Sequence, residues 1–176
     1  MTDNAPANAD TRRAGIIAAV ATLVLDQALK LWVYHVLDIA NRGIIEVTSF
    51  FNIVLVWNRG ISYGLFQQED DLGRWLLVGL SVAAAIALAI WATRAKTVLV
   101  GVSLGLILGG AVGNAIDRSV YGAVLDFVHL HAYGYNWYVF NIADAGIVAG
   151  VAGLLYDSVF LDHKRQKETH DPDKSA

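Results

Sequence analysis

Two copies of an Asn-x-x-Asp pattern lie close together in the second half of the chain. Asn114 and Asp117 form the first copy, within GNAIDR, and Asn141 and Asp144 form the second, within FNIAD. A spacing of three places the two side chains of each copy on one face of a helix. A further carboxylate, Asp126, lies between the copies in the string VLDF. This concentration of carboxylates and amides indicates acid–base chemistry.

Two of these carboxylates are expected to work as a pair. Two acids within a few ångströms of each other cannot both ionise cheaply, so one keeps its proton into the neutral pH range. The charged member can then take a proton from water while the protonated member polarises a carbonyl. We expect this pair to be Asp126 and Asp144, because the helix that begins near Asp144 favours its charged form. Asp117, beside Arg118, is expected to be a permanent charge and is a third candidate.

Membrane spans must position these residues. The chain has 176 residues, of which 56% are hydrophobic and only 16% are charged, which is low for a soluble domain. A span needs about 20 mainly apolar residues, and four stretches meet this requirement. We expect a single domain over residues 14–161, with polar tails at 1–13 and 162–176. The predicted spans are residues 14–37, 75–92, 97–116 and 140–161.

The first span carries two charges in its far half. It follows Arg12 and Arg13 as a secretory signal would, but it is too long for an h-region and no small-residue cleavage site follows, so we expect a retained helix. Asp26 and Lys30 are one helical turn apart and can neutralise each other. They are expected either to form a structural ion pair or to take part in a site. Buried acids are costly in a membrane and usually mark function.

The placement of Lys and Arg predicts the orientation. Basic residues precede the first span, fill the link between the second and third, and follow the fourth. These regions are therefore expected to be cytoplasmic, which puts both termini inside and the carboxylates near the outer face. The asymmetry is incomplete, because Arg42, Arg59, Arg74 and Arg118 fall on the outer side. The expected cytoplasmic cations are Arg12, Arg13, Arg94, Lys96, Lys164, Arg165 and Lys167.

The segment before the second span is expected to form a β-like platform on the outer surface. Residues 45–57 are rich in β-branched and aromatic side chains, which favours strands, whereas residues 61–66 resemble an interfacial piece. Asp126 is expected in a loop that folds back onto the bundle. Aromatic side chains at such an interface are usually anchors. They are Phe50, Phe51, Trp57 and Phe66.

Small residues repeat every four positions within the later spans, which predicts close packing between helices. The third span has four such glycines, and the fourth and second spans have shorter series. Packing explains these residues without a ligand. They are Gly101, Gly105, Gly109 and Gly113 in the third span, Gly146 and Gly150 in the fourth, and Gly79, Ala83 and Ala87 in the second.

Other functional classes fit the residues less well. A transporter would spread its acids through the membrane depth, and no span here is broken by proline. A zinc peptidase could use Asp126, His129 and His131, but no HExxH string is present, and we expect no metal or other cofactor. A serine triad would need Ser62 or Ser119, neither of which has a nucleophile-elbow context. The chain has no cysteine, which excludes disulfides and a cysteine nucleophile. A purely structural protein would have little reason to keep these acids.

Five short motifs occur in the order typical of the lipoprotein signal peptidases (signal peptidase II), and the chain resembles that family through nearly all of residues 14–161. Each motif is weak alone, but their order is specific. They are DQALK at Asp26 to Lys30, NRGISYG at Asn58 to Gly64, GNAIDR at Gly113 to Arg118, VLDF at Val124 to Phe127 and FNIAD at Phe140 to Asp144.

The resemblance implies an intramembrane aspartic endopeptidase of the bacterial inner membrane. It would cleave diacylglyceryl-modified prolipoproteins on the N-terminal side of the lipidated cysteine, with Asp126 and Asp144 as the catalytic pair. We expect a monomer in contact with membrane lipid and without a nucleic-acid partner. The family often has Ala-Ala-Phe where this chain has Ile61, Ser62 and Tyr63, so contacts with substrate are expected to differ there. The residues expected to support substrate and pair are Asn58, Gly60, Asn114, Asp117, Arg118, Asn141, Asp26 and Lys30.

Overall fold

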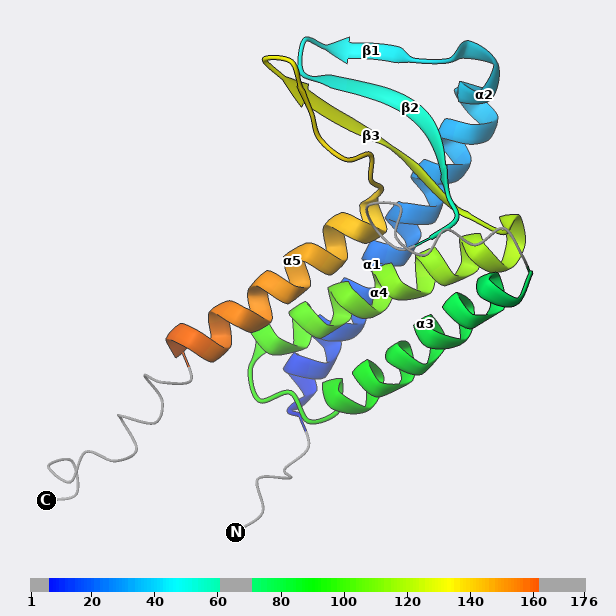
Figure 1. Cartoon of the computed structure of the whole chain (residues 1–176). Helices are drawn as coiled ribbons and strands as arrows, with labels where there is room; N and C mark the ends of the chain where they lie inside the picture. The colour runs from blue at the N-terminus through cyan, green and yellow to red at the C-terminus, as the bar shows by residue number, and fades with distance from the viewer. Residues whose placement is uncertain (1–6, 61–70, 162–176) are drawn as a thin grey trace, which may run out of the picture.

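Four long helices form a bundle, and a four-stranded antiparallel sheet covers one end of it (Figure 1). The computed structural model describes residues 7–60 and 71–161. Four helical stretches are long and apolar enough to cross a membrane, namely Ala9–Val36, Leu72–Ala92, Val98–Tyr121 and Ile142–Leu161, and the first and last of them each include a π-helical end. The predicted mainly helical membrane fold is therefore confirmed. The long helices are α1 (Ala9–Leu31), α3 (Asp71–Ala92), α4 (Val98–Tyr121) and α5 (Ile142–Tyr156). The shorter elements are α2 (Ile39–Arg42), the π-helices η1 (Trp32–Val36) and η3 (Asp157–Leu161), and strands β1 (Ile45–Thr48), β2 (Phe51–Asn58), β3 (Val124–Ala132) and β4 (Tyr135–Asn136).

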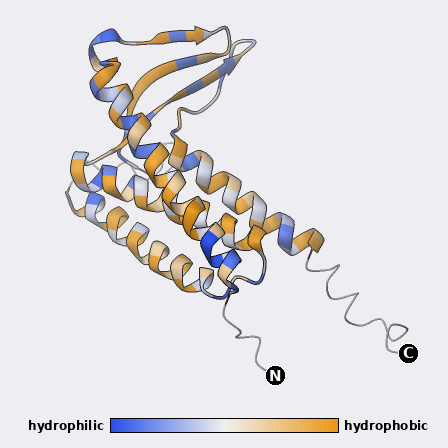
Figure 2. Ribbon diagram, turned by 180° about the vertical axis from the view of Figure 1, so that it is seen from behind, coloured by the Kyte–Doolittle hydropathy of each residue, from blue (hydrophilic) through white to orange (hydrophobic). Residues whose placement is uncertain are grey.

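The outer surface of the bundle is apolar. Hydrophobic colour predominates along the long helices in Figure 2, and many large aliphatic side chains on them are exposed. A surface of this kind is stable against lipid tails rather than water. Examples are Ile16, Val20, Leu76, Leu80, Ile86, Val148 and Leu155.

Two helix boundaries differ from the predicted ones because of local capping. The side chain of Asn8 accepts a hydrogen bond from the Thr11 amide (2.7 Å), so α1 begins at Ala9 and includes part of the predicted tail. Helix α4 continues to Tyr121 and ends where Gly122 adopts a positive φ of 78°. Asp117 and Arg118 therefore lie inside the last turns of α4, beyond the predicted end of the third span.

The glycine repeat of α4 makes the predicted close contact with another helix, and that helix is α1. A Cβ added to Gly101 or Gly105 would meet the backbone of α1, at Thr11 and Gly15 respectively. Backbones can approach this closely only where side chains are missing. On α5, Gly150 faces Ser103 of α4 in the same way. The prediction for the second span was wrong, because Gly79, Ala83 and Ala87 are exposed and α3 packs on α4 through another face.

Strands β1 and β2 form the predicted platform, and β3 completes it. The expectation that Asp126 lies in a loop was wrong: β3 pairs antiparallel with β2 and places Asp126 opposite Val56. The side chains beneath the sheet form its core, which explains why this segment is an ordered strand rather than a loop. That core consists of Val33, Ile39, Leu125 and Phe127. The predicted interfacial piece at 61–66, the aromatic Phe66 and the cations Lys164, Arg165 and Lys167 lie outside the described residues.

Candidate active site

Asp126 is fully buried on β3, and both of its carboxyl oxygens are hydrogen-bonded. Asn141 Nδ2 donates to Oδ1 (2.6 Å) and Asn58 Nδ2 donates to Oδ2 (3.1 Å). Asn58 comes from the last position of β2, which the sheet register brings next to Asp126. Two donors on two oxygens hold the carboxyl group in a single orientation.

Asp144 lies in the first turn of α5 and is part of a capping box. Its amide donates to Asn141 Oδ1 (3.0 Å), while Asn141 N donates back to Asp144 Oδ2 (3.4 Å). The other oxygen, Oδ1, accepts from Asn114 Nδ2 (2.9 Å). The FNIAD spacing therefore has a local structural cause, since it builds the box that begins the helix.

Two asparagine side chains connect the two carboxylates. Asn141 Nδ2 donates to Asp126 and also lies 3.3 Å from Asn114 Oδ1. Asn114 in turn donates to Asp144. The two Asn-x-x-Asp copies, from α4 and α5, thus meet at one end of the bundle, as their sequence positions predict.

Asp126 and Asp144 interact electrostatically. Burial raises the pKa of Asp126 well above its ordinary value, to about 7, and the neighbouring charge of Asp144 adds to that rise. The hydrogen bonds from Asn58 and Asn141, and the charge of Lys30, act in the opposite direction. Since burial dominates, Asp126 keeps its proton near neutral pH, as expected for one member of an acid pair.

Lys30 is the centre of a buried charge cluster. Its Nζ lies 2.7 Å from Asp26 Oδ2 and 2.8 Å from Asp117 Oδ2, and it donates to Asn114 Oδ1 (3.2 Å). The predicted ion pair between Asp26 and Lys30 is present, but it includes Asp117. Asp117 is therefore paired with Lys30 rather than held by its neighbour Arg118.

The acids of this cluster also position the two carboxylates of the site. Asp26 Oδ1 accepts from the amide of Ala143 (2.9 Å), which precedes Asp144 in α5. Asp117 Oδ2 accepts from the amide of Leu125 (3.1 Å), which precedes Asp126 in β3. Each buried acid thus fixes the backbone of a neighbour of Asp126 or Asp144.

Sequence reasoning missed two residues of this network. Gln27 Nε2 donates to Asp117 Oδ1 (2.9 Å) and lies 3.2 Å from Asp26 Oδ2. In the sequence, Gln27 could have been noticed as a side-chain amide within an apolar helix, between Asp26 and Lys30. Arg74 donates to the carbonyls of Arg118 (2.8 Å) and Ser119 (2.5 Å) and so caps the end of α4. Only the fold reveals that contact.

Arg118 and Gly60 lie at the edge of the network. Arg118 Nη2 donates to the carbonyl of Gly60 (2.7 Å), and the Gly60 amide donates to Asn58 Oδ1 (3.1 Å). Arg118 is close enough to Asp144 and Asp126 to interact with their charges. Gly60 is therefore tied to α4 beside the two carboxylates.

The residues of the alternative sites are arranged differently. His129 and His131 stack with ring centroids 5.4 Å apart, on the face of β3 opposite to Asp126. Those three side chains therefore do not share a metal site. Ser119 donates its hydroxyl to the Ala115 carbonyl (2.8 Å) within α4, and Ser62 lies outside the described residues.

Comparison with known proteins identifies the family of the chain that carries this network. The sequence profile of signal peptidase (SPase) II matches residues 18–160. The chain belongs to the signal peptidase II family. It is 59% identical to a lipoprotein signal peptidase of Methylobacterium radiotolerans over 155 residues, which are 88% of this chain and 91% of the relative. A lipoprotein signal peptidase of Nitrobacter hamburgensis is 55% identical over 150 residues, covering 83% and 92% of the two chains.

Solved structures agree with the signal peptidase II assignment. A bacterial membrane enzyme determined by the in meso method at 2.3 Å resolution superposes with a TM-score of 0.71 at 28% identity, covering 84% of this chain and 90% of that one. A second, at 1.9 Å resolution, has a TM-score of 0.70 at 27% identity, with coverage of 84% and 94%. The protein is thus a multi-pass aspartic-type peptidase that acts on lipoprotein precursors in the membrane.

Proposed function

We propose that Asp126 and Asp144 are the catalytic pair of this signal peptidase II. The pair removes the signal peptide of a diacylglyceryl-modified prolipoprotein on the N-terminal side of the lipidated cysteine. The observation that carries the proposal is the chain of amides from Asp126 through Asn141 and Asn114 to Asp144. It orients both carboxyl groups, and orientation of this kind is what proton transfer to and from a bound substrate requires.

In the proposed reaction, Asp126 is the neutral acid and Asp144 the ionised base. Asp144 takes a proton from water, the water oxygen forms a bond to the scissile carbonyl carbon, and Asp126 gives its proton to the carbonyl oxygen. The tetrahedral intermediate then breaks its carbon–nitrogen bond as Asp144 returns a proton to the leaving amine. Asp126 recovers its proton from the hydroxyl of the new carboxyl group.

The remaining assignments follow from this reaction and from the charge pattern. We propose that both termini are cytoplasmic and that the sheet and the two aspartates lie at the outer face of the inner membrane. The basic residues Arg12, Arg94 and Lys96 belong to the opposite, cytoplasmic end. Both described ends of the chain lie at the end of the bundle away from the sheet (Figure 1). The predicted domain of residues 14–161 acts as one monomeric peptidase, and its first helix extends back to Ala9.

The pH dependence of processing tests which aspartate is the acid. Asp126 loses its proton as the pH rises through about 7, so processing should fall about tenfold per pH unit above that value. Because its pKa is raised in the folded state, the free energy of unfolding should also fall as the pH rises from about 4 to above 7. We would measure single-turnover cleavage by the purified enzyme from about pH 5 to about pH 9.

An Asn58→Ala variant provides the matched comparison for this profile. The hydrogen bond from Asn58 lowers the pKa of Asp126, so its removal should move the alkaline limb to higher pH. A rate that stays level through neutral pH, or a limb that moves to lower pH in this variant, would contradict the assignment of Asp126 as the acid.

The Asp117→Asn change should act through stability. Asp117 binds the Leu125 amide, Lys30 and Gln27 rather than Asp126 itself. We expect a lower free energy of unfolding and, per folded molecule, a loss of processing of less than about tenfold. Cleavage and thermal unfolding should be measured on the same sample. Complete loss of cleavage with unchanged unfolding would make Asp117 a member of the catalytic group.

A further inference from the structure

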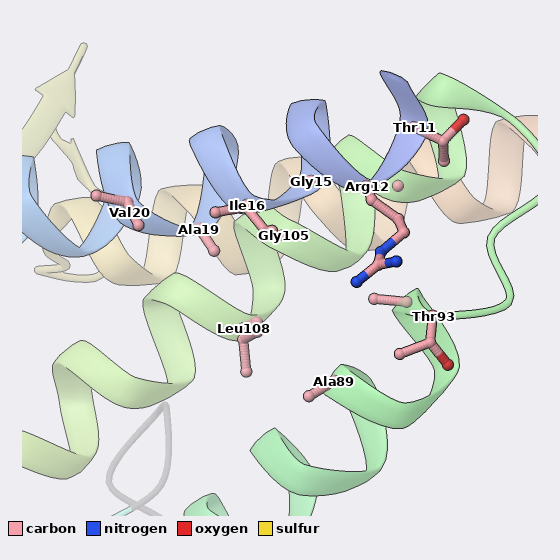
Figure 3. A pocket seen from close by; sticks show the side chains of 12 residues that line it. Thr11, Arg12, Gly15, Ile16, Ala19, Val20, Ala89, Thr93, Gly105 and Leu108 are labelled. Carbon is pink, nitrogen blue, oxygen red and sulfur yellow. The ribbon is translucent and has the colours of Figure 1, made fainter. Parts of the chain in front are cut away.

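A pocket far from the carboxylate network opens beside the first turns of α1, between α1, α3 and α4 (Figure 3). Its volume is about 300 Å³, at the lower end of the range of ligand pockets. Its walls are small and apolar along most of their length. The residues that shape it include Gly15, Ile16, Ala19 and Val20 of α1, Ala89 of α3 and Leu108 of α4.

The pocket is a consequence of how the three helices pack. Helices α1 and α3 both pack on α4, and the close contact of Gly15 with Gly105 forms the floor between them. From α3, only the short side chains of Ala89, Ala92 and Thr93 reach this space. The end of the groove is closed by the Ala7 amide, which donates to the Thr93 carbonyl (2.8 Å).

A cation lies at that closed end. Figure 3 shows the guanidinium of Arg12 extending from α1 across the pocket toward Ala89 and Thr93. Among residues 7–60 and 71–161, no carboxylate forms an ion pair with Arg12. From Arg12 to Val20 the apolar part of the groove runs for about 12 Å along α1. The groove therefore has a positive end at the membrane surface and an apolar remainder within the membrane.

We propose that this groove binds one acyl chain of an anionic phospholipid whose phosphate is held by Arg12. This phospholipid belongs to the membrane leaflet at which α1 begins. A headgroup with a net negative charge matches the guanidinium, and the chain fills space that the alanines and glycines leave open.

Two other occupants fit the charge pattern less well. The n-region of a signal peptide is basic and would place its cations against Arg12. A second copy of this chain in the same membrane orientation would bring its own Arg12 and Arg13 to the same level, again with like charges together. An anionic lipid is the occupant that neutralises this end.

Retention of lipid by the intact protein tests the proposal. The full chain in detergent is titrated with phosphatidylglycerol or phosphatidylethanolamine, and bound lipid is counted by native mass spectrometry. The wild type should prefer phosphatidylglycerol, and Arg12→Gln should reduce that preference about fivefold. Arg13→Gln is the matched control, because Arg13 is exposed but does not line the pocket, and its effect should stay within about twofold.

A second pair of variants tests the position of the acyl chain. Ala89→Leu should fill the groove and lower retention of both lipids, whereas Ala87→Leu, also exposed on α3 but outside the pocket, should not. Thermal unfolding of each variant verifies that it is folded. Equal effects of the two arginine changes, or an Ala89→Leu variant that retains lipid normally, would overturn the proposal. So would a dimer that Ala89→Leu abolishes, because the occupant would then be a second copy.

Discussion

An Asp126→Asn enzyme should process a diacylglyceryl prolipoprotein more than about a thousandfold more slowly than the wild type. The change keeps the shape of the side chain but removes the proton that the carbonyl oxygen requires. Because the pKa of Asp126 is raised to about 7, below that pH the substitution replaces one neutral side chain by another. One of the two hydrogen bonds from Asn58 and Asn141 is lost, because both are donors and the new amide offers a single acceptor. The variant should therefore still insert and accumulate.

The Asp144→Asn enzyme should lose activity to the same extent, since no base then remains to take the proton from water. Asp38→Asn is the matched control, because Asp38 is exposed and interacts with Asn41 rather than with the site. Cleavage of a purified lipidated substrate is measured by gel shift, and folding by thermal unfolding in the same detergent. Near-normal cleavage by either Asp126→Asn or Asp144→Asn would contradict the assignment of the catalytic pair.

Lys30→Met should cause the largest loss of stability. Lys30 is 4% exposed and is paired with both Asp26 and Asp117. Removing the lysine leaves two buried carboxylates without their cation, and breaking a buried pair in this way costs about 3–5 kcal/mol. Since the same acids hold the Ala143 and Leu125 amides, the backbone next to Asp144 and Asp126 should loosen as well. Unfolding in mixed micelles measures the loss.

A charge-neutral variant distinguishes lost charge balance from lost packing. Combining Lys30→Met with Asp26→Asn and Asp117→Asn removes all three charges, and we expect it to recover part of the free energy of unfolding. Arg13→Met, at an exposed position, should change that free energy by less than about 0.5 kcal/mol. If Lys30→Met unfolds no more easily than Arg13→Met, the charge cluster does not stabilise the bundle.

The local parts of the site could be predicted from the sequence. The Asn-x-x-Asp spacing indicated which side chains share a helix face, and the Asn141 and Asp144 copy is indeed a capping box. The four-residue spacing of Asp26 and Lys30 indicated their ion pair. Contacts within one or two helical turns depend on helix geometry alone, so they needed no knowledge of how the elements pack.

Contacts between distant segments could not be predicted in this way. Asp126 was expected in a loop, because β3 is ordered through its pairing with β2 and through the core beneath the sheet, and both depend on segments distant in the sequence. The role of Gln27 and the cap that Arg74 places on α4 likewise depend on which helices are neighbours. The glycine repeat of α4 predicted a close contact but not that α1 would be the partner.

From the order of residues alone it follows that this protein spans a membrane four times, that its acids lie toward one end of the spans, and that its ordered motifs are those of the signal peptidase II family. Length and hydropathy are enough to identify the spans, because the thickness of the bilayer requires about 20 apolar residues of any helix that crosses it. The acids stand out within these apolar stretches because charges there are costly, and the family follows from the order of the five motifs. The packing of the helices and the sheet was needed to show which side chains meet. It brings Asn58, Asn114 and Asn141 from three elements around Asp126 and Asp144. Burial there, and not residue type, raises the pKa of Asp126, because an acid in a low-dielectric surrounding keeps its proton.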